Sequence, residues 1–294
     1  MFHGIYTALV TPFTQEGEID FGGLETLIEK QISAGVDGLV LLGTTAEAAT
    51  LSQTEKTDLL RVATRQINKR VKIIIGTGTN CTASTLANSQ EALSYEPDGL
   101  LVVTPYYNKP NPSGLIAHYR QLAKLGTPLV LYHIPGRTGL KVPAKVMNTL
   151  LNEVPAIKAV KESDYDMCAV TDMAVQYSQQ INYLCGNDDL FLQYLSIHCS
   201  GIISAAANVL APAFVNIYRH WQKGQTRQAF DLFSQAYPLI KCCYAETNPT
   251  CVKYLLSRLG IGTDAVRLPL GPVDPSNKEK IDAVLAQTNK SLLI

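Results

Sequence analysis

The segment Val36-Asp-Gly-Leu-Val-Leu-Leu-Gly-Thr-Thr45 (VDGLVLLGTT) returns in part as Pro97-Asp-Gly-Leu-Leu-Val-Val-Thr104 (PDGLLVVT). In both copies an Asp-Gly pair precedes an apolar run, and threonine ends the run. Unbroken apolar runs are typical of strands covered on both faces, as in a parallel sheet. A repeat that spans about two strand–helix units fits a barrel built from eight such units.

Similar apolar runs alternate with amphipathic stretches over roughly the first three quarters of the chain, a spacing that predicts strand–helix units. Apolar residues recur at helical spacing between Phe21 and Ile32, and Ser52 with Glu55 predicts a capping box before the next helix. A doubly wound open sheet would instead need a glycine fingerprint after the first strand, where the chain reads TPFTQEG. The predicted strands are Ile5–Val10, Gly38–Leu42, Val71–Ile75, Gly99–Val103, Pro128–Tyr132, Ile157–Lys161, Tyr183–Cys185 and Gly201–Ser204.

These patterns predict an α/β fold, a (β/α)8 TIM barrel with a C-terminal helical extension. After about Arg227 no strand pattern remains, and helices are predicted over Ala229–Ala245, Asn248–Leu259 and Asn277–Leu293. We therefore expect residues 1–224 to form the barrel with the active site, and residues 225–294 to form an α-helical domain.

Composition narrows the class of function. Hydrophobic residues make up 46% of the 294 residues, and 25 basic residues balance 25 acidic ones. A neutral chain of this kind has no basic surface for nucleic acid or an anionic membrane. The seven cysteines form no CxxC pair, and MFHGIYTALV lacks the layout of a signal peptide. We expect a cytoplasmic protein with reduced thiols.

Polar residues at the ends of the predicted strands are candidates for catalysis, because TIM-barrel active sites lie at the carboxyl ends of the strands. Metal binding is not expected, since His133 with Glu162 is too small a ligand set. Opposed carboxylates for glycoside hydrolysis are limited to Glu47 and Glu162, and no GxSxG elbow is present. The polar residues at the strand ends mainly carry hydroxyl groups, and they include one lysine and one arginine.

The lysine is Lys161, which ends the run Ala156-Ile-Lys-Ala-Val-Lys-Glu-Ser163. A buried amine is favoured in its uncharged form, which can attack a carbonyl and form a Schiff base. The iminium then makes the adjacent carbon acidic enough to become an enamine nucleophile. A lysine at a strand end can equally extend its ammonium into solvent, as we expect for Lys158, and the run itself does not choose between the two.

The chain contains four ordered motifs, Gly43-Thr-Thr-Ala-Glu47, Thr104-Pro-Tyr-Tyr-Asn108, Tyr132-His-Ile-Pro-Gly-Arg-Thr-Gly139 and Val160-Lys-Glu162. With Gly186-Asn-Asp188 and Gly201-Ile-Ile-Ser204, they resemble the dihydrodipicolinate synthase / N-acetylneuraminate lyase family over essentially the whole chain. The resemblance implies an aldolase-type lyase without a cofactor that joins pyruvate to L-aspartate 4-semialdehyde, on the route to diaminopimelate and lysine. It also implies a homotetramer built as a dimer of dimers.

The resemblance also implies roles for single residues. Lys161 matches the Schiff-base lysine, and Tyr132 matches the tyrosine that exchanges protons with the substrate. Thr44 and Tyr107 match the rest of a hydroxyl relay, with Tyr107 entering a neighbouring subunit's site. The substrate-binding positions that match are Thr45 for the pyruvate carboxylate, Gly186 and Ile203 around the pyruvate, and Arg137 for the carboxylate of the semialdehyde.

Arg137 favours the synthases over the family's sugar-acid lyases and 2-keto-3-deoxy-acid aldolases, which would use the same lysine. A barrel that binds a small oxo acid without turnover is the alternative outside enzymes. The chain departs from the usual family pattern at Ala46, His133 and Asp164, and these residues are expected to influence the shape of the pyruvate pocket and the choice of substrate.

Overall fold

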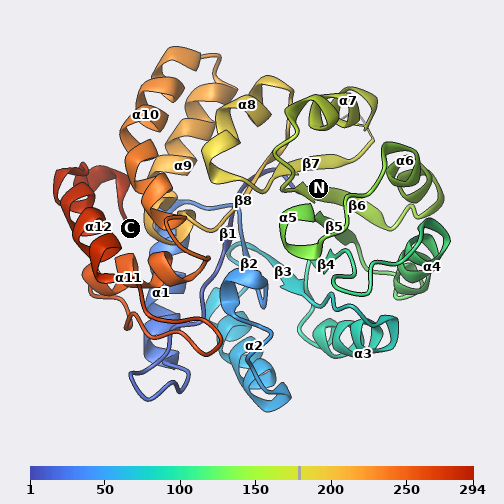
Figure 1. Cartoon of the computed structure of the whole chain (residues 1–294), viewed down its shortest axis with the longest axis horizontal. Helices are drawn as coiled ribbons and strands as arrows, with labels where there is room; N and C mark the ends of the chain where they lie inside the picture. The colour runs from blue at the N-terminus through green and yellow to red at the C-terminus, as the bar shows by residue number, and fades with distance from the viewer. Residues whose placement is uncertain (178–179) are drawn as a thin grey trace. The chain divides into compact units, whose positions relative to one another are not determined.

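The computed structural model describes residues 1–177 and 180–294. Within these residues eight strands follow one another in chain order around a closed barrel, as predicted, and helices separate them (Figure 1). The strands are β1 (Gly4–Ala8), β2 (Gly38–Leu41), β3 (Lys72–Gly76), β4 (Gly99–Val103), β5 (Leu129–His133), β6 (Ile157–Glu162), β7 (Asn182–Cys185) and β8 (Gly201–Ser204).

The strand limits agree with the predicted ones to within about two residues. Pro128, predicted to begin a strand, lies just before β5, because proline has no N–H to donate to a neighbouring strand. Its carbonyl still accepts a hydrogen bond from the Leu100 N–H at 2.9 Å. The parallel pairing of β5 with β6 places Tyr132 opposite Lys161 and His133 opposite Glu162.

The chain divides into two compact units, which do not follow the predicted boundary at residue 225; that boundary stays a prediction. The first unit comprises Met1–His3 and Ile73–Ile203. In Figure 1 its helices α3, α4 and α6 lie along the outer side of β3 to β6. Its helices are α3 (Thr82–Leu93), α4 (Pro112–Ala123), α5 (Pro135–Thr138), α6 (Ala144–Glu153), α7 (Met167–Tyr177) and α8 (Phe191–Ser196), with the 3-10 turn η2 (Asp188–Leu190).

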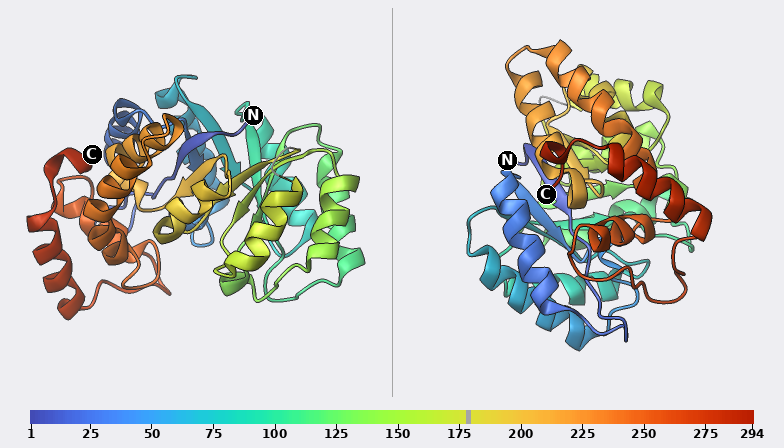
Figure 2. Two further views of the ribbon diagram at one scale, coloured as in Figure 1. Left: turned by 90° about the horizontal axis from the view of Figure 1, so that it is seen from above. Right: turned by 90° about the vertical axis from the view of Figure 1, so that its left-hand side faces the viewer.

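The second unit comprises Gly4–Lys72 and Ser204–Ile294, so the C-terminal helices belong with the first two strands. Figures 1 and 2 show α10 beside α9 and α12. Helices in this unit are α1 (Phe21–Ala34), α2 (Gln53–Ile67), α9 (Ala207–Gln222), α10 (Thr226–Cys243), α11 (Thr250–Arg258) and α12 (Pro275–Gln287), with the 3-10 turns η1 (Thr44–Ala46) and η3 (Lys290–Leu292).

Buried hydrogen bonds join the N-terminal and C-terminal segments that make up the second unit. Asn208 at the start of α9 donates to the Ala8 carbonyl at 2.7 Å and accepts from the Val10 N–H at 3.1 Å. Gln31 of α1 donates to the Ala207 carbonyl and accepts from the Thr7 hydroxyl. Since these polar groups are buried, losing any one of them leaves a partner unsatisfied, at about 1–3 kcal/mol. Polar contacts as well as apolar packing therefore fix how the N-terminal segment lies against α9 in this unit.

Local capping explains where two helices begin and end. The predicted capping box is present at α2, where Ser52 and Glu55 each accept the other's backbone N–H. The last helix, predicted to run to Leu293, ends at Gln287 instead. The Asn289 side chain accepts the Ser291 N–H and begins a separate 3-10 turn, so a side chain bonded to the backbone two residues on replaces continued helix.

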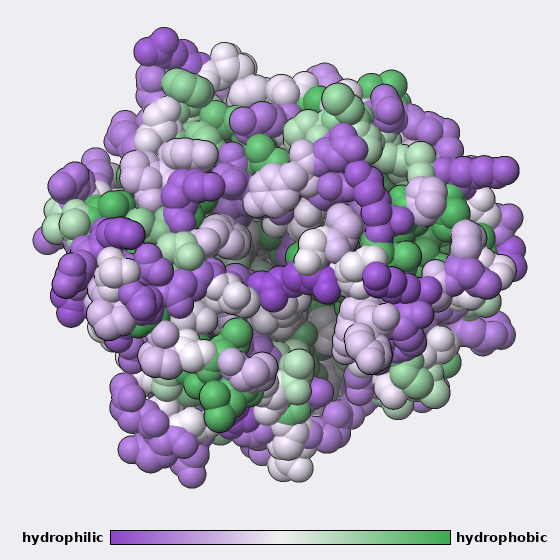
Figure 3. All heavy atoms as spheres, viewed as in Figure 1, coloured by the Kyte–Doolittle hydropathy of each residue, from purple (hydrophilic) through white to green (hydrophobic). Residues whose placement is uncertain are grey.

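On the face seen in Figure 3, hydrophilic and hydrophobic residues are interspersed. Among the residues described, none of the helices is both long enough and apolar enough to span a membrane. The described residues likewise contain no group of three or more His, Cys, Asp or Glu side chains that gather as metal ligands.

Candidate active site

Lys161 is the last residue but one of strand β6, and its side chain is buried. The residue is 7% exposed, whereas Lys158 on the same strand faces solvent. Successive strand residues point to opposite faces, so two lysines three positions apart separate in this way. Lys158 therefore faces solvent, as expected from the sequence, and Lys161 is the buried one of the two lysines. A buried primary amine at the carboxyl end of a barrel strand is what carbonyl chemistry requires.

Tyr132 lies beside this amine. It occupies the neighbouring position on β5, is buried, and its ring centroid is 4.3 Å from Lys161 Nζ. The backbone there is fixed by the Thr104 N–H, which donates to the Tyr132 carbonyl at 3.0 Å. The sheet register itself thus brings together the two residues for which the sequence predicted the central roles.

Gly186 follows β7 and must be glycine because the chain passes so close to β6. Its N–H donates to the Glu162 carbonyl at 2.7 Å. A Cβ at this position would lie 2.0 Å from Ser163 Oγ and 2.7 Å from the same carbonyl oxygen. No side chain can be accommodated without moving the end of β6, which carries Lys161.

Gly186→Ala is therefore expected to displace Lys161 and, on the role that the resemblance implies for this lysine, to lower kcat/KM about 100-fold, the usual cost of misplacing reacting groups by about an ångström. Steady-state kinetics, with thermal unfolding measured alongside, test this. Gly271→Ala is the matched control, because a Cβ there meets nothing within 4 Å. Kinetics of Gly186→Ala equal to those of the control would contradict the steric argument.

Of the other predicted site residues in the first unit, Ile203 in β8 is buried, whereas Arg137 on the short helix α5 and Tyr107 are exposed. Tyr107 is 88% exposed and has a left-handed backbone, with φ +70°. The next residue, Asn108, fixes this turn by donating to the Asn80 carbonyl at 2.7 Å. Tyr107 is thus held outward on an ordered turn.

Thr44 and Thr45 lie in the second unit, on the 3-10 turn η1 that follows β2. Thr44 is exposed, whereas Thr45 is buried and its Oγ1 accepts a hydrogen bond from Asn248 Nδ2 at 3.0 Å. The left-handed residue of this turn is Glu47, with φ +53°, and not Ala46. Ala46 therefore needs none of glycine's conformational freedom, and its methyl group is accommodated.

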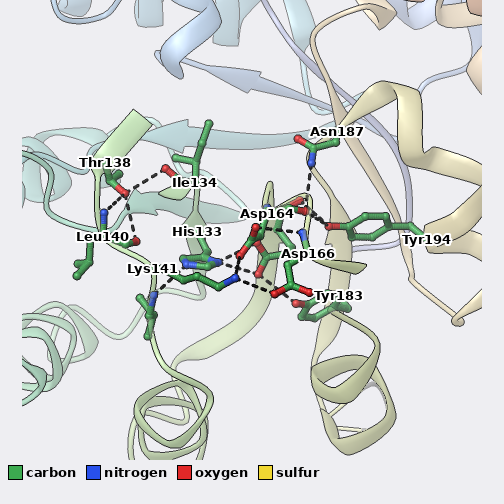
Figure 4. A network of polar contacts seen from close by, with 12 residues as sticks. His133, Ile134, Thr138, Leu140, Lys141, Asp164, Asp166, Tyr183, Asn187 and Tyr194 are labelled. Carbon is green, nitrogen blue, oxygen red and sulfur yellow. Dashed lines mark hydrogen bonds and ion pairs between the residues drawn. The ribbon is translucent and has the colours of Figure 1, made fainter. Parts of the chain in front are cut away.

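A hydrogen-bond network surrounds His133, the second departure from the family pattern (Figure 4). Its Nε2 accepts from the Val142 N–H at 3.1 Å, so the ring proton resides on Nδ1. That nitrogen lies 2.8 and 2.9 Å from the two Glu162 carboxylate oxygens. The Tyr183 hydroxyl donates to the same carboxylate, and burial, followed by the charge of Glu162, raises the pKa of Tyr183. From the sequence, His133 and Glu162 were considered together only as metal ligands, and their pairing was not predicted.

Asp164, the third departure from the family pattern, is engaged with a cation. Lys141 Nζ lies 3.0 Å from its carboxylate and 2.9 Å from that of Asp166 (Figure 4). Burial acts to raise the pKa of Asp164, but hydrogen bonds from the Asp166 N–H and from Lys141 outweigh it and lower that pKa. The Asp164 carboxylate is thus paired with a cation from the segment between α5 and α6.

Comparison with known proteins identifies the family of this chain. The family model of the dihydrodipicolinate synthetase family matches residues 1–288. A 4-hydroxy-tetrahydrodipicolinate synthase from Maridesulfovibrio salexigens is 37% identical over 285 residues, 97% of each chain. The structure of the corresponding synthase from Methylacidiphilum fumariolicum SolV superimposes with a TM-score of 0.95 at 35% identity, covering 99% of this chain and 97% of that one.

A chloride-inhibited dihydrodipicolinate synthase from Acinetobacter baumannii, solved in complex with pyruvate, is also similar. Its TM-score is 0.94 at 32% identity, with 98% of this chain and 99% of that chain covered. The resemblance predicted from the motifs is thereby confirmed. With its barrel, its buried strand-end lysine and these relatives, the chain belongs to the dihydrodipicolinate synthetase family.

Proposed function

We propose that this enzyme is a 4-hydroxy-tetrahydrodipicolinate synthase, which joins pyruvate to L-aspartate 4-semialdehyde through a Schiff base on Lys161. The observation that carries the proposal is the buried Lys161 amine beside Tyr132. Attack of Nζ on the pyruvate carbonyl carbon and loss of water give an iminium. Loss of a methyl proton then gives the enamine.

The enamine carbon next attacks the aldehyde carbon of the second substrate, and the aldehyde oxygen takes up a proton. The amino group of that substrate then attacks the iminium carbon, which closes the ring and frees Lys161. Tyr132, Thr44 and Tyr107 are proposed to carry the protons, since hydroxyls exchange protons without placing a fixed charge beside the iminium. Thr45 is proposed to bind the pyruvate carboxylate, with Gly186 and Ile203 around the bound keto acid.

The substrate is tested with a panel of keto acids and aldehydes. Product formation from pyruvate and L-aspartate 4-semialdehyde is expected, whereas N-acetylneuraminate and 2-keto-3-deoxygluconate remain uncleaved. Arg137, an exposed guanidinium on α5, is proposed to hold the carboxylate of the semialdehyde in a bidentate pair. Arg137→Ala should therefore raise KM for the semialdehyde and leave pyruvate binding unchanged. Cleavage of either sugar acid would favour a lyase, and pyruvate binding without any turnover would favour a binding protein.

Tyr107 is proposed to complete the site of a second copy within a homotetramer. Support comes from its 88% exposure on a turn with left-handed backbone. Large aromatic residues held outward in this way are typical of interfaces. We expect Tyr107→Phe and Lys161→Ala to be nearly inactive alone, yet to regain activity when unfolded together and refolded. In a mixed dimer one site has an intact Lys161 and receives an intact Tyr107. No recovery, with mixed oligomers verified by mass, would contradict a shared tyrosine.

A further inference from the structure

We propose that the buried ion pair between Glu47 and Lys253 positions the η1 turn and thereby sets the affinity of the enzyme for the carboxylate of its keto acid. The inference rests on the proposed function, because it takes Thr45 as part of the carboxylate site. Glu47 and Lys253 are positioning residues, and both belong to the second compact unit.

The ion pair is direct and fully enclosed. Lys253 Nζ donates to Glu47 Oε1 at 2.7 Å, and each side chain is 1% exposed. The Arg267 N–H donates to the other carboxylate oxygen at 2.8 Å. With both oxygens held by separate donors, the Glu47 carboxylate has a fixed position and orientation. Buried charges are stable only when paired and hydrogen-bonded in this way.

A second cation and a second carboxylate balance the surroundings of the ion pair. Lys253 Nζ lies 3.8 Å from the centroid of the Phe13 ring, and the Arg267 guanidinium carbon lies 4.5 Å from it. Arg267 pairs in turn with Glu55, whose pKa it lowers to about 2. Burial lowers the pKa of Lys253 to about 8 despite Glu47, so the amine is still mainly protonated at pH 7. The ion pair is charged under ordinary conditions.

Glu47 connects this cluster to the turn. It is the first residue after η1, and its N–H closes the turn by donating to the Thr44 carbonyl at 3.1 Å. Its left-handed φ of +53° is uncommon for a residue with a side chain and persists only where surrounding contacts impose it. The contacts that hold it here are those of its carboxylate with Lys253 and Arg267, together with the Thr50 N–H and hydroxyl, which both donate to its carbonyl.

The segment that carries Lys253 also contacts the turn at a second point. Asn248, just before α11, donates from Nδ2 to Thr45 Oγ1 at 3.0 Å. One short stretch of chain thus holds Thr45 directly and holds the residue that ends its turn. If Lys253 is released, both contacts lose their common support. The expected effect is on binding of the carboxylate and not on the covalent step.

The test compares two ketones that react with the same lysine. Adducts at Lys161 are trapped with borohydride over a range of concentrations of pyruvate, which has a carboxylate, and of acetone, which has none. In Glu47→Gln and Lys253→Met, the pyruvate concentration for half-maximal trapping should rise about tenfold to a hundredfold. Acetone trapping should stay at the wild-type level, which general loss of structure would not produce.

Two further variants complete the design. Glu47→Gln/Lys253→Met leaves no buried charge unpaired, and it is expected to fold and still to bind pyruvate weakly. Arg258→Met removes an exposed ion pair with Asp282 from the same helix, and it should behave as wild type. Wild-type pyruvate affinity in the double variant, or equal losses for both ketones, would overturn the positioning role. If the wild-type protein itself traps no pyruvate, the proposed function fails instead.

Discussion

Lys161→Ala is expected to abolish the borohydride-trapped pyruvate adduct and to lower kcat/KM by a factor on the order of 10⁴ or more. Without the amine no iminium forms, and the methyl group of pyruvate retains its ordinary, very weak acidity. Intact-protein mass after trapping measures the adduct, and product formation from both substrates measures turnover. Because the change removes a side chain from the end of a strand, the variant should keep its fold, which thermal unfolding verifies.

Two other lysines provide sharp controls for this experiment. Lys158 lies on the same strand but faces solvent, and Lys158→Ala should trap pyruvate as wild type does. Lys253 is the more demanding comparison, because it is also buried and burial lowers its pKa to about 8. An adduct mapped to Lys253, or one that persists in Lys161→Ala, would refute the assignment of the nucleophile.

Glu47→Gln is expected to lower the free energy of unfolding by about 3–5 kcal/mol, because it leaves the Lys253 charge buried without its partner. Urea unfolding at pH 7 measures the change. Adding Lys253→Met should restore most of the loss, since a neutral pair of similar volume has no desolvated charge. At pH 9 the wild-type amine, with its pKa of about 8, is mainly neutral, so the cost of Glu47→Gln should be smaller there.

The exposed Arg258–Asp282 pair is the control for this cycle. Its side chains are accessible to water and salt, so its removal should change the free energy of unfolding by less than about 1 kcal/mol. A Glu47→Gln variant as stable as Arg258→Met would contradict the view that the buried pair is strongly coupled. A double variant no more stable than the single one would contradict it as well.

The barrel could be predicted because its signals are local. A strand covered on both faces needs a continuous apolar run, and all eight strands were found in this way to within about two residues. The end of the last helix was predicted wrongly because a capping side chain decided it. Asn289 bonds the backbone of Ser291, and hydrophobic spacing contains no sign of that contact.

The candidate site was predictable in part for the same reason. Lys161 and Tyr132 lie next to the carboxyl ends of adjacent strands, so their proximity follows from the topology. Glu47 and Glu162 were visible as the available carboxylates, but their partners were not. Lys253 lies 206 residues from Glu47, and the pairing of Glu162 with His133 depends on the register of two strands. Contacts of this kind depend on three-dimensional packing, which a single sequence does not specify.

Both nitrogens of His133 are committed, one to a backbone N–H and the other to Glu162, whose carboxylate also receives the Tyr183 hydroxyl. Loss of Glu162 leaves the His133 Nδ1–H and the Tyr183 hydroxyl without their acceptor, and loss of His133 leaves the Val142 N–H without one. Loss of the Tyr183 hydroxyl is milder, because the carboxylate keeps His133 and the Asp164 N–H as donors. His133 and Glu162 should therefore be retained together among descendants of this chain. Exposed positions nearby, such as Lys141 and Asp166, remain free to vary one at a time.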